Sequence, residues 1–204
     1  MLPPLTRRFF LSSQYFFAAV GTVLLIYCGA MTVRARLFQE GESRSFEERR
    51  GVSHASWVGQ REPSNSAVKR PKPFEGSIVA RLTIPDLGIT SMVVEGVSHE
   101  DLSVALGHIP GTALPGEAGN VVIAGHRDTG FRPLRYIHAN EMIKLTTFSE
   151  EYRYRIVSTE IVLPTDIRVL YPTSRDTLTL VTCYPFGFVG PAPRRFVVRA
   201  ERIR

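Results

Sequence analysis

The feature that most constrains this fold is an uncharged run of 25 residues near the amino terminus. Positions 9–33 hold no Asp, Glu, Lys or Arg, and the letters "YFFAAVGTVLLIYCGAM" within them are strongly apolar. A helix needs about 20 predominantly apolar residues to cross a bilayer. The run therefore predicts one transmembrane anchor over residues 9–33, after a short cytoplasmic segment, residues 1–8.

A cleaved signal peptide is the other interpretation of this run. The apolar part of a signal peptide spans roughly 7–15 residues, fewer than are found here. The letters "LIYCG" resemble a lipoprotein cleavage box, but bulky Tyr27 stands where a small residue belongs. The length of the run therefore favours an uncleaved, single-pass anchor in the cytoplasmic membrane. The short amino-terminal side favours an orientation that places the rest of the chain on the extracytoplasmic side. Charge adds little to this orientation, because arginines flank both ends: Arg7, Arg8, Arg34 and Arg36.

The residue composition of the chain changes twice after the anchor. Residues 34–75 are polar, rich in Arg, Glu, Ser and Pro, and contain a Pro-Lys-Pro run, which predicts an extended linker with a short charged helix over 37–50. From residue 76 onward, short segments of alternating apolar and polar residues follow one another. We therefore expect one folded domain over residues 76–204.

The pattern within residues 76–204 is typical of an all-β fold with short helices. Ser98 and Asp101 form a capping box that predicts a short helix, which Gly107 should end. Many short strands with only minor helices favour a closed or nearly closed β-barrel. The expected strands carry the letters "SIVARLTI", "TSMVVEG", "NVVIAGH", "EMIKLTTF", "EYRYRIVSTEIVL", "TLTLVTC" and "RFVVRAERI", with helical turns at "FRPLRYI" and "TDIRVL".

Charge and cysteine usage narrow the class of protein. The net charge is +6, but the basic residues are scattered and no basic stripe is interleaved with aromatics, which argues against nucleic acid binding. Of the two cysteines, Cys28 lies in the predicted span and Cys183 in the folded domain, so they cannot pair. Exported domains favour paired cysteines, so a lone thiol there is a candidate reactive group.

Three residues form the candidate catalytic set. Cys183 ends the alternating strand "TLTLVTC", where it is either a small buried hydrophobe or a nucleophile. His126 follows an apolar strand, which gives a catalytic base a rigid support. Arg195 opens the last strand; it is either a solvated edge residue or a donor to a developing oxyanion. The adjacent Arg194 is the alternative to it.

The remaining polar candidates carry weaker signals. His108 competes with His126, although we expect it to hydrogen-bond a loop. Asp128, just after His126, is expected in a turn or an ion pair; the alternative is a third member of a catalytic triad. Four acidic residues in loops or caps are candidates for Ca²⁺, but we interpret them as surface charges and predict no metal and no cofactor: Glu95, Glu100, Asp101 and Glu117.

These motifs resemble those of the sortases, membrane-anchored cysteine transpeptidases of the bacterial surface. The resemblance covers residues 76–204 and rests on "AGH" ending at His126, "TLTLVTC" ending at Cys183 and "RRFVV" containing Arg195. Their order, with separations of 57 and 12 residues, is similar to that of the family. The stretches "GHIPGTALPGEAGNVVIAGHRD" and "TLTLVTCYPF" look most like class D sortases. The fold implied is a closed eight-stranded sortase-type β-barrel.

The resemblance also implies a reaction. Cys183 would attack the Thr–Gly bond of a Leu-Pro-x-Thr-Gly-like motif, His126 would act as general acid and base, and Arg195 would stabilise the oxyanion. Thr182 would add a donor at the substrate carbonyl or merely fill the strand. The implied partners are surface proteins that carry the sorting motif and an amine acceptor such as a peptidoglycan precursor or a pilin.

Two other functions fit the same residues. A membrane-anchored cysteine peptidase would use the same thiol and imidazole with water as acceptor, although papain-like and caspase patterns are missing from the sequence. A non-catalytic β-barrel that binds a wall component would merely bury Cys183.

Overall fold

In this computed structural model, residues 4–57 and 72–203 are described, and residues 1–3, 58–71 and 204 lie outside the description. The chain divides into two compact units, Met1–Phe38 and Gln39–Arg204. Helix α1 (Pro4–Trp57) begins in the first unit and ends in the second. Its segment Gln14–Gly51 is long and apolar enough to cross a membrane, by length and composition, and fits a single-pass anchor.

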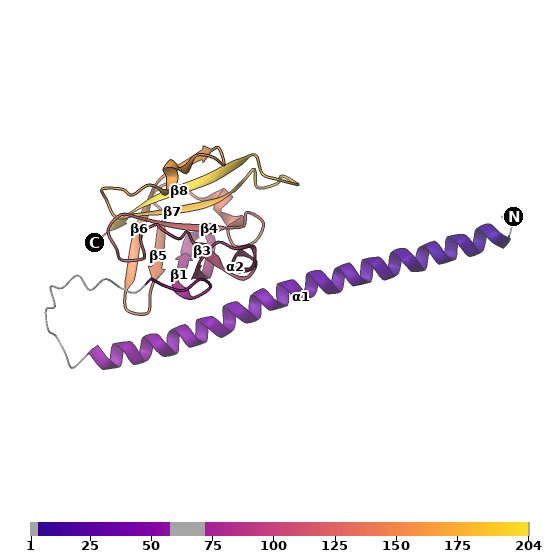
Figure 1. Cartoon of the computed structure of the whole chain (residues 1–204), viewed down its shortest axis with the longest axis horizontal. Coiled ribbons are helices and arrows are strands. Elements are labelled where there is room, and N and C mark those ends of the chain that lie inside the picture. Colours follow the sequence, from indigo (N-terminus) through magenta and orange to yellow (C-terminus); the bar gives the residue numbers. More distant parts are fainter. Residues whose placement is uncertain (1–3, 58–71, 204) are drawn as a thin grey trace. The chain divides into compact units, whose positions relative to one another are not determined.

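The second unit is a closed barrel of eight strands, as predicted (Figure 1). The strands follow the order β1-β2-β3-β4-β7-β8-β6-β5 around the barrel, and β5 closes on β1. The pairs β2–β3 and β4–β7 are parallel, and the other neighbours are antiparallel. The strands are β1 (Ile78–Ile84), β2 (Ile89–Glu95), β3 (Leu106–His108), β4 (Asn120–Gly125), β5 (Met142–Thr146), β6 (Glu151–Val162), β7 (Thr177–Tyr184) and β8 (Arg194–Ile203).

Short helices connect the strands. The helical turns expected at "FRPLRYI" and "TDIRVL" are the 3-10 helices η2 (Arg132–Tyr136) and η3 (Ile167–Leu170), and η1 (Pro85–Leu87) links β1 to β2. The predicted capping box is present at the start of α2 (His99–Val104), where Ser98 Oγ accepts from the Asp101 N–H.

The prediction that Gly107 ends this helix was wrong. Helix α2 ends at Val104, and Gly107 lies inside β3, the strand that the sequence pattern did not indicate. A side chain at Gly107 would meet the Gly96 carbonyl oxygen at 2.2 Å, so glycine is needed for close strand packing rather than for a helix end. Three residues are too few to show an alternating pattern.

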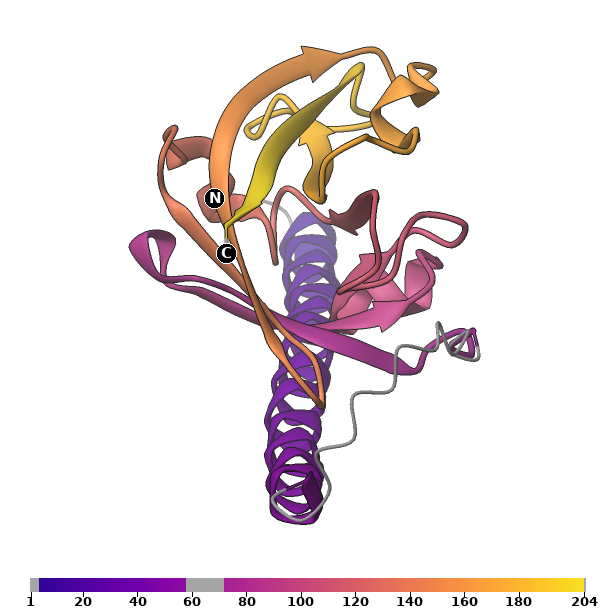
Figure 2. The ribbon, with the colours of Figure 1, turned by 90° about the vertical axis from the view of Figure 1, so that its left-hand side faces the viewer.

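The barrel interior is apolar because alternate residues of each strand point inward. Leu178 and Leu180 of β7 and Val198 and Ala200 of β8 belong to this core. The long β6 runs beside β8 over most of its length (Figure 2). The other large core side chains include Leu82, Leu106, Ile123, Phe131, Leu134, Ile143, Leu145, Tyr154 and Ile156.

The end of α1 packs on the barrel within the second unit. Phe46 is fully buried, with its ring 4.6 Å from that of Phe148 and beneath the Arg81 guanidinium. Gln39 receives a hydrogen bond from the Met92 N–H (2.8 Å) and donates one to a backbone carbonyl on α2. The helix expected over residues 37–50 therefore exists, as part of α1, and contacts the folded domain.

Candidate active site

Strand register places the three candidate catalytic residues at one level of the barrel. Cys183 on β7 pairs directly with Arg195 on β8. On the other side of β7, Gly125 of the parallel β4 pairs with Thr182, so His126 follows at the level of Cys183. Neighbouring strands lie roughly 5 Å apart, so the three residues occupy adjacent positions across the sheet.

The same three residues share the outer face of the barrel. Leu180 and Val198 point into the core, and side chains alternate between the two faces, so Cys183 and Arg195 point outward. Arg194 pairs with Tyr184 and alternates to the other face. The register therefore brings Arg195, rather than Arg194, to the face that carries the thiol.

The candidate residues are partly accessible. Cys183 is a free, half-buried cysteine, and the His126 side chain is half-buried. The Arg195 guanidinium donates to the carbonyl oxygens of Ala192 (3.3 Å) and Arg194 (3.1 Å). A partly exposed thiol beside an imidazole and a fixed cation has the composition of a nucleophilic site.

Thr182 is tied to the sheet by its side chain. Its hydroxyl donates to the Gly125 carbonyl oxygen at 2.7 Å, and the residue is 2% exposed. This bond joins the end of β4, just before His126, to the residue before Cys183. A contact between Thr182 and substrate stays a prediction.

The loop between β6 and β7 is fastened over the same outer face. The buried Asn120 amide donates to the carbonyls of Val169 (2.9 Å) and Tyr171 (3.1 Å), and Thr179 donates to Asn120 Oδ1 (2.7 Å). In this loop, the hydrogen bond and charge of the Arg168 guanidinium lower the pKa of the Asp166 carboxyl. The loop is thus held against the outer face at the start of β4.

Three polar residues form contacts that bear on the sequence predictions: His99, Glu95 and His108. The His99 ring lies 6.1 Å from the His126 ring at 64°, and His99 is exposed. Glu95 was interpreted as a surface charge, but it is buried and accepts a hydrogen bond from His108 Nδ1 at 2.6 Å. His108 also contacts the Ala113 carbonyl at 3.0 Å, so its predicted bond to a loop is confirmed. These pairings join segments that no local pattern relates.

The other acidic candidates have local roles. Asp101 forms the capping box, Glu117 accepts from the Leu114 N–H at 2.8 Å, and Asp128 lies exposed in a turn. Across residues 4–57 and 72–203, no group of three or more His, Cys, Asp or Glu side chains is arranged to hold a metal ion.

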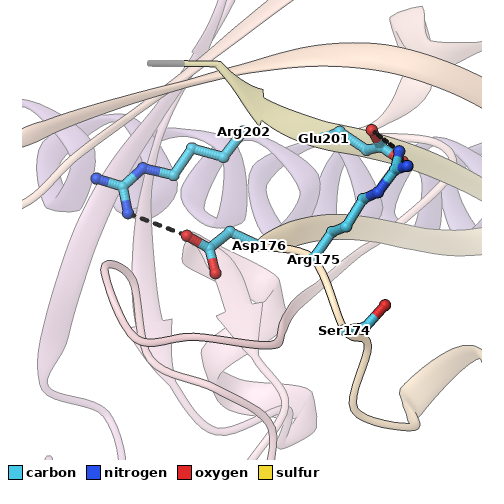
Figure 3. Close-up of a pocket in the computed structure, with 5 residues that line it drawn as sticks. All are labelled: Ser174, Arg175, Asp176, Glu201 and Arg202. Carbon is cyan, nitrogen blue, oxygen red and sulfur yellow. Dashed lines mark hydrogen bonds and ion pairs between the residues drawn. The ribbon is translucent and has the colours of Figure 1, made fainter.

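A separate cavity of about 510 Å³ lies at the other end of β7 (Figure 3). Its charged residues form two ion pairs, Arg175 with Glu201 and Arg202 with Asp176. Glu201 pairs with Thr177, six positions along the strand from Cys183, a separation of roughly 20 Å. This cavity is therefore distinct from the candidate active site. Its lining residues are Ser174, Arg175, Asp176, Glu201 and Arg202.

Comparison with known proteins defines the class. The Sortase domain family model matches residues 82–203. The chain is 35% identical over 133 residues to Sortase D of Bacillus subtilis, covering 65% of this chain and 67% of that protein. It is 28% identical to Sortase A of Streptococcus agalactiae, of which it spans about half (52%).

Solved structures of sortases are also similar to this chain. A Clostridium perfringens Sortase D5 transpeptidase superposes with a TM-score of 0.62 at 27% identity, covering 81% of this chain and 96% of that one. Sortase A from Corynebacterium diphtheriae gives a TM-score of 0.59 at 26% identity, covering 78% and 84%. The family match and these relatives support a cysteine transpeptidase in general terms. The chain belongs to the sortase family.

Proposed function

We propose that this sortase cleaves a C-terminal Leu-Pro-x-Thr-Gly-like sorting motif and transfers the protein to an amine at the cell surface. The observation that carries the proposal is the register of β4, β7 and β8, which aligns His126, Cys183 and Arg195 on one outer face. We further propose the organisation expected above: residues 1–8 cytoplasmic, 9–33 in the membrane and 76–204 as the extracytoplasmic catalytic domain. Residues 34–75 would connect the two, and their helical part would pack on the barrel through Phe46.

The first half of the proposed reaction makes a thioacyl-enzyme. His126 takes the proton of the Cys183 thiol, and the thiolate attacks the carbonyl carbon of the Thr–Gly bond. Arg195 donates to the resulting oxyanion with a charge that it cannot lose. The C–N bond then breaks, and His126 returns the proton to the leaving glycine amine.

The second half transfers the acyl group. An acceptor amine attacks the thioester carbonyl and gives its proton to His126. The C–S bond breaks, and Cys183 regains a proton. The similarity to Sortase D supports a class D assignment. We propose motif-bearing surface proteins as the donors and a peptidoglycan precursor or pilin amine as the acceptor.

The test uses the full-length protein in detergent with a mixture of Leu-Pro-x-Thr-Gly peptides and added amines. We expect mass spectrometry to find the peptide joined to the amine through threonine. The product should disappear in Cys183→Ala and persist in Cys28→Ala, which removes the other thiol. Transfer by Cys183→Ala would contradict the nucleophile assignment.

The two alternative functions give different results in the same assay. A peptidase would release the threonine carboxylate at a rate that added amine does not change. A wall-binding barrel would form no thioacyl intermediate, and its Cys183 would resist alkylation in the folded state. For the membrane side, a reporter fused after Arg204 should behave as exported; reporter activity in the cytoplasm would contradict this topology.

A further inference from the structure

Arg127 contacts the loop between β7 and β8 through both terminal nitrogens of its guanidinium. Nη1 donates to the Pro185 carbonyl at 3.1 Å, and Nη2 donates to the carbonyls of Phe188 (2.7 Å) and Gly190 (3.0 Å). The guanidinium carbon also lies 5.8 Å from the centre of the Phe188 ring. One side chain therefore binds three backbone groups of a single loop.

The loop that Arg127 binds connects two of the proposed catalytic residues. It starts at Pro185, after the strand that carries Cys183, and leads into the strand that carries Arg195. Arg127 itself is the residue that follows His126. Its hydrogen bonds thus join the backbone beside the proposed base to the connection between the proposed nucleophile and the proposed oxyanion donor.

The loop has little internal support. Within the described positions 185–193, one backbone–backbone hydrogen bond is present, from the Phe188 N–H to the Pro185 carbonyl at 3.3 Å. A second guanidinium holds the other end of the loop, because Arg195 Nη1 donates to the Ala192 carbonyl at 3.3 Å. If Arg195 turns toward an oxyanion, this second bond breaks, and the bonds from Arg127 remain.

We propose that Arg127 is a positioning residue that keeps the β7–β8 loop closed, so that Arg195 stays beside Cys183 when its own bond to the loop is released. The inference rests on the proposed function for its effect on rate. The chemistry suits the role, because a guanidinium keeps its charge and presents up to five N–H donors in one plane. A lysine keeps the charge but has a compact ammonium group in place of the planar fork.

The test compares full-length Arg127→Ala and Arg127→Lys with the wild type in detergent. Arg175→Ala is the matched control, since it removes an exposed arginine at the other end of β7. Two quantities are measured: amide hydrogen exchange over residues 185–193, and single-turnover acylation by the Leu-Pro-x-Thr-Gly mixture, normalised to the titrated active thiol.

For Arg127→Ala we expect exchange in the loop to rise at least about tenfold and the saturating acylation rate to fall about tenfold, because small misplacements of reacting groups cost large factors in rate. The half-saturating peptide concentration should stay within about twofold, since the bonds from Arg127 go to the loop. Arg127→Lys should give intermediate values, and Arg175→Ala should match the wild type. If Arg127→Ala does not fold, the same two measurements on Arg127→Lys decide the question.

Several outcomes would overturn the inference. Unchanged loop exchange in the Arg127 variants would refute the closure. Faster exchange with an unchanged acylation rate would refute the positioning role. A raised half-saturating concentration at an unchanged rate would make Arg127 a substrate-binding residue instead. Failure of the wild type to acylate would refute the proposed function and the positioning role with it, while the exchange data would still decide whether Arg127 closes the loop.

Discussion

Cys183 on β7 and Arg195 on β8 are direct cross-strand partners, and both side chains point to the outer face of the barrel. Directly paired residues in an antiparallel sheet have Cβ atoms about 5 Å apart. A substrate carbonyl attacked by Cys183 would therefore form its oxyanion within reach of the Arg195 guanidinium.

The first prediction separates Arg195 from its neighbour. Arg195→Ala should lower single-turnover acylation by roughly 10²–10³, the usual effect of losing one oxyanion donor. Arg195→Lys should not restore the full rate, because the planar fork is lost. Arg194→Ala should cost far less, since Arg194 is exposed on the other side of the strand. The opposite result would move the catalytic role to Arg194.

The second prediction concerns the buried pair of His108 and Glu95. The His108 side chain is 1% exposed, and its Nδ1 lies 2.6 Å from Glu95 Oε2. His108→Leu would leave the Glu95 carboxylate buried without this donor and should lower the free energy of unfolding by about 3–5 kcal/mol. Adding Glu95→Gln removes the charge and should recover part of the loss. Urea unfolding of both variants measures this. If His108→Leu and the double variant lose the same free energy of unfolding, the two residues are not coupled.

The third prediction concerns the contact between α1 and the barrel. Phe46→Ala should lower the free energy of unfolding of the barrel by about 3 kcal/mol, because a fully buried ring is lost. Glu48→Ala, at an exposed position of the same helix, should change it little. A variant that begins at residue 39 should likewise be more stable in urea than one that begins at residue 76. Equal stability of these two variants would refute a stabilising role for the helix.

The fourth prediction is an alkaline loss of stability. Burial raises the pKa of Tyr154 to about 12, partly offset by the charge of Arg202, whereas an unfolded tyrosine ionises near about pH 10. Between these values the folded protein keeps a proton that the unfolded chain releases. The neutral, buried Tyr154 therefore contributes about 2–3 kcal/mol to the free energy of unfolding. This contribution is complete below about pH 10 and is lost as the pH rises toward about 12.

Urea titrations at about pH 9 and pH 11.5 check this prediction. Tyr154→Phe should lose less stability between the two pH values than the wild type does. Tyr136→Phe is the control, because Tyr136 is 65% exposed. An equal alkaline loss in wild type and Tyr154→Phe would show that Tyr154 is not the group responsible.

Local patterns predicted much of the fold. The alternation in "TLTLVTC" and "EYRYRIVSTEIVL" indicated β7 and β6, and the box of Ser98 and Asp101 indicated the start of α2. Each of these signals lies within a few residues, where side-chain spacing directly reflects the period of a strand or the cap of a helix. The short β3 had no such period and was missed.

The uncharged run, seven of the eight strands, and the order of His126, Cys183 and Arg195 could be predicted from the sequence alone. Three relationships became visible in the folded protein: these three residues take adjacent positions across the sheet, Glu95 is buried against His108, and Arg127 binds the β7–β8 loop. The physical reason is that periodicity records which face of a strand is buried. Which strands become neighbours, and in which register, depends on closing the whole barrel around one core.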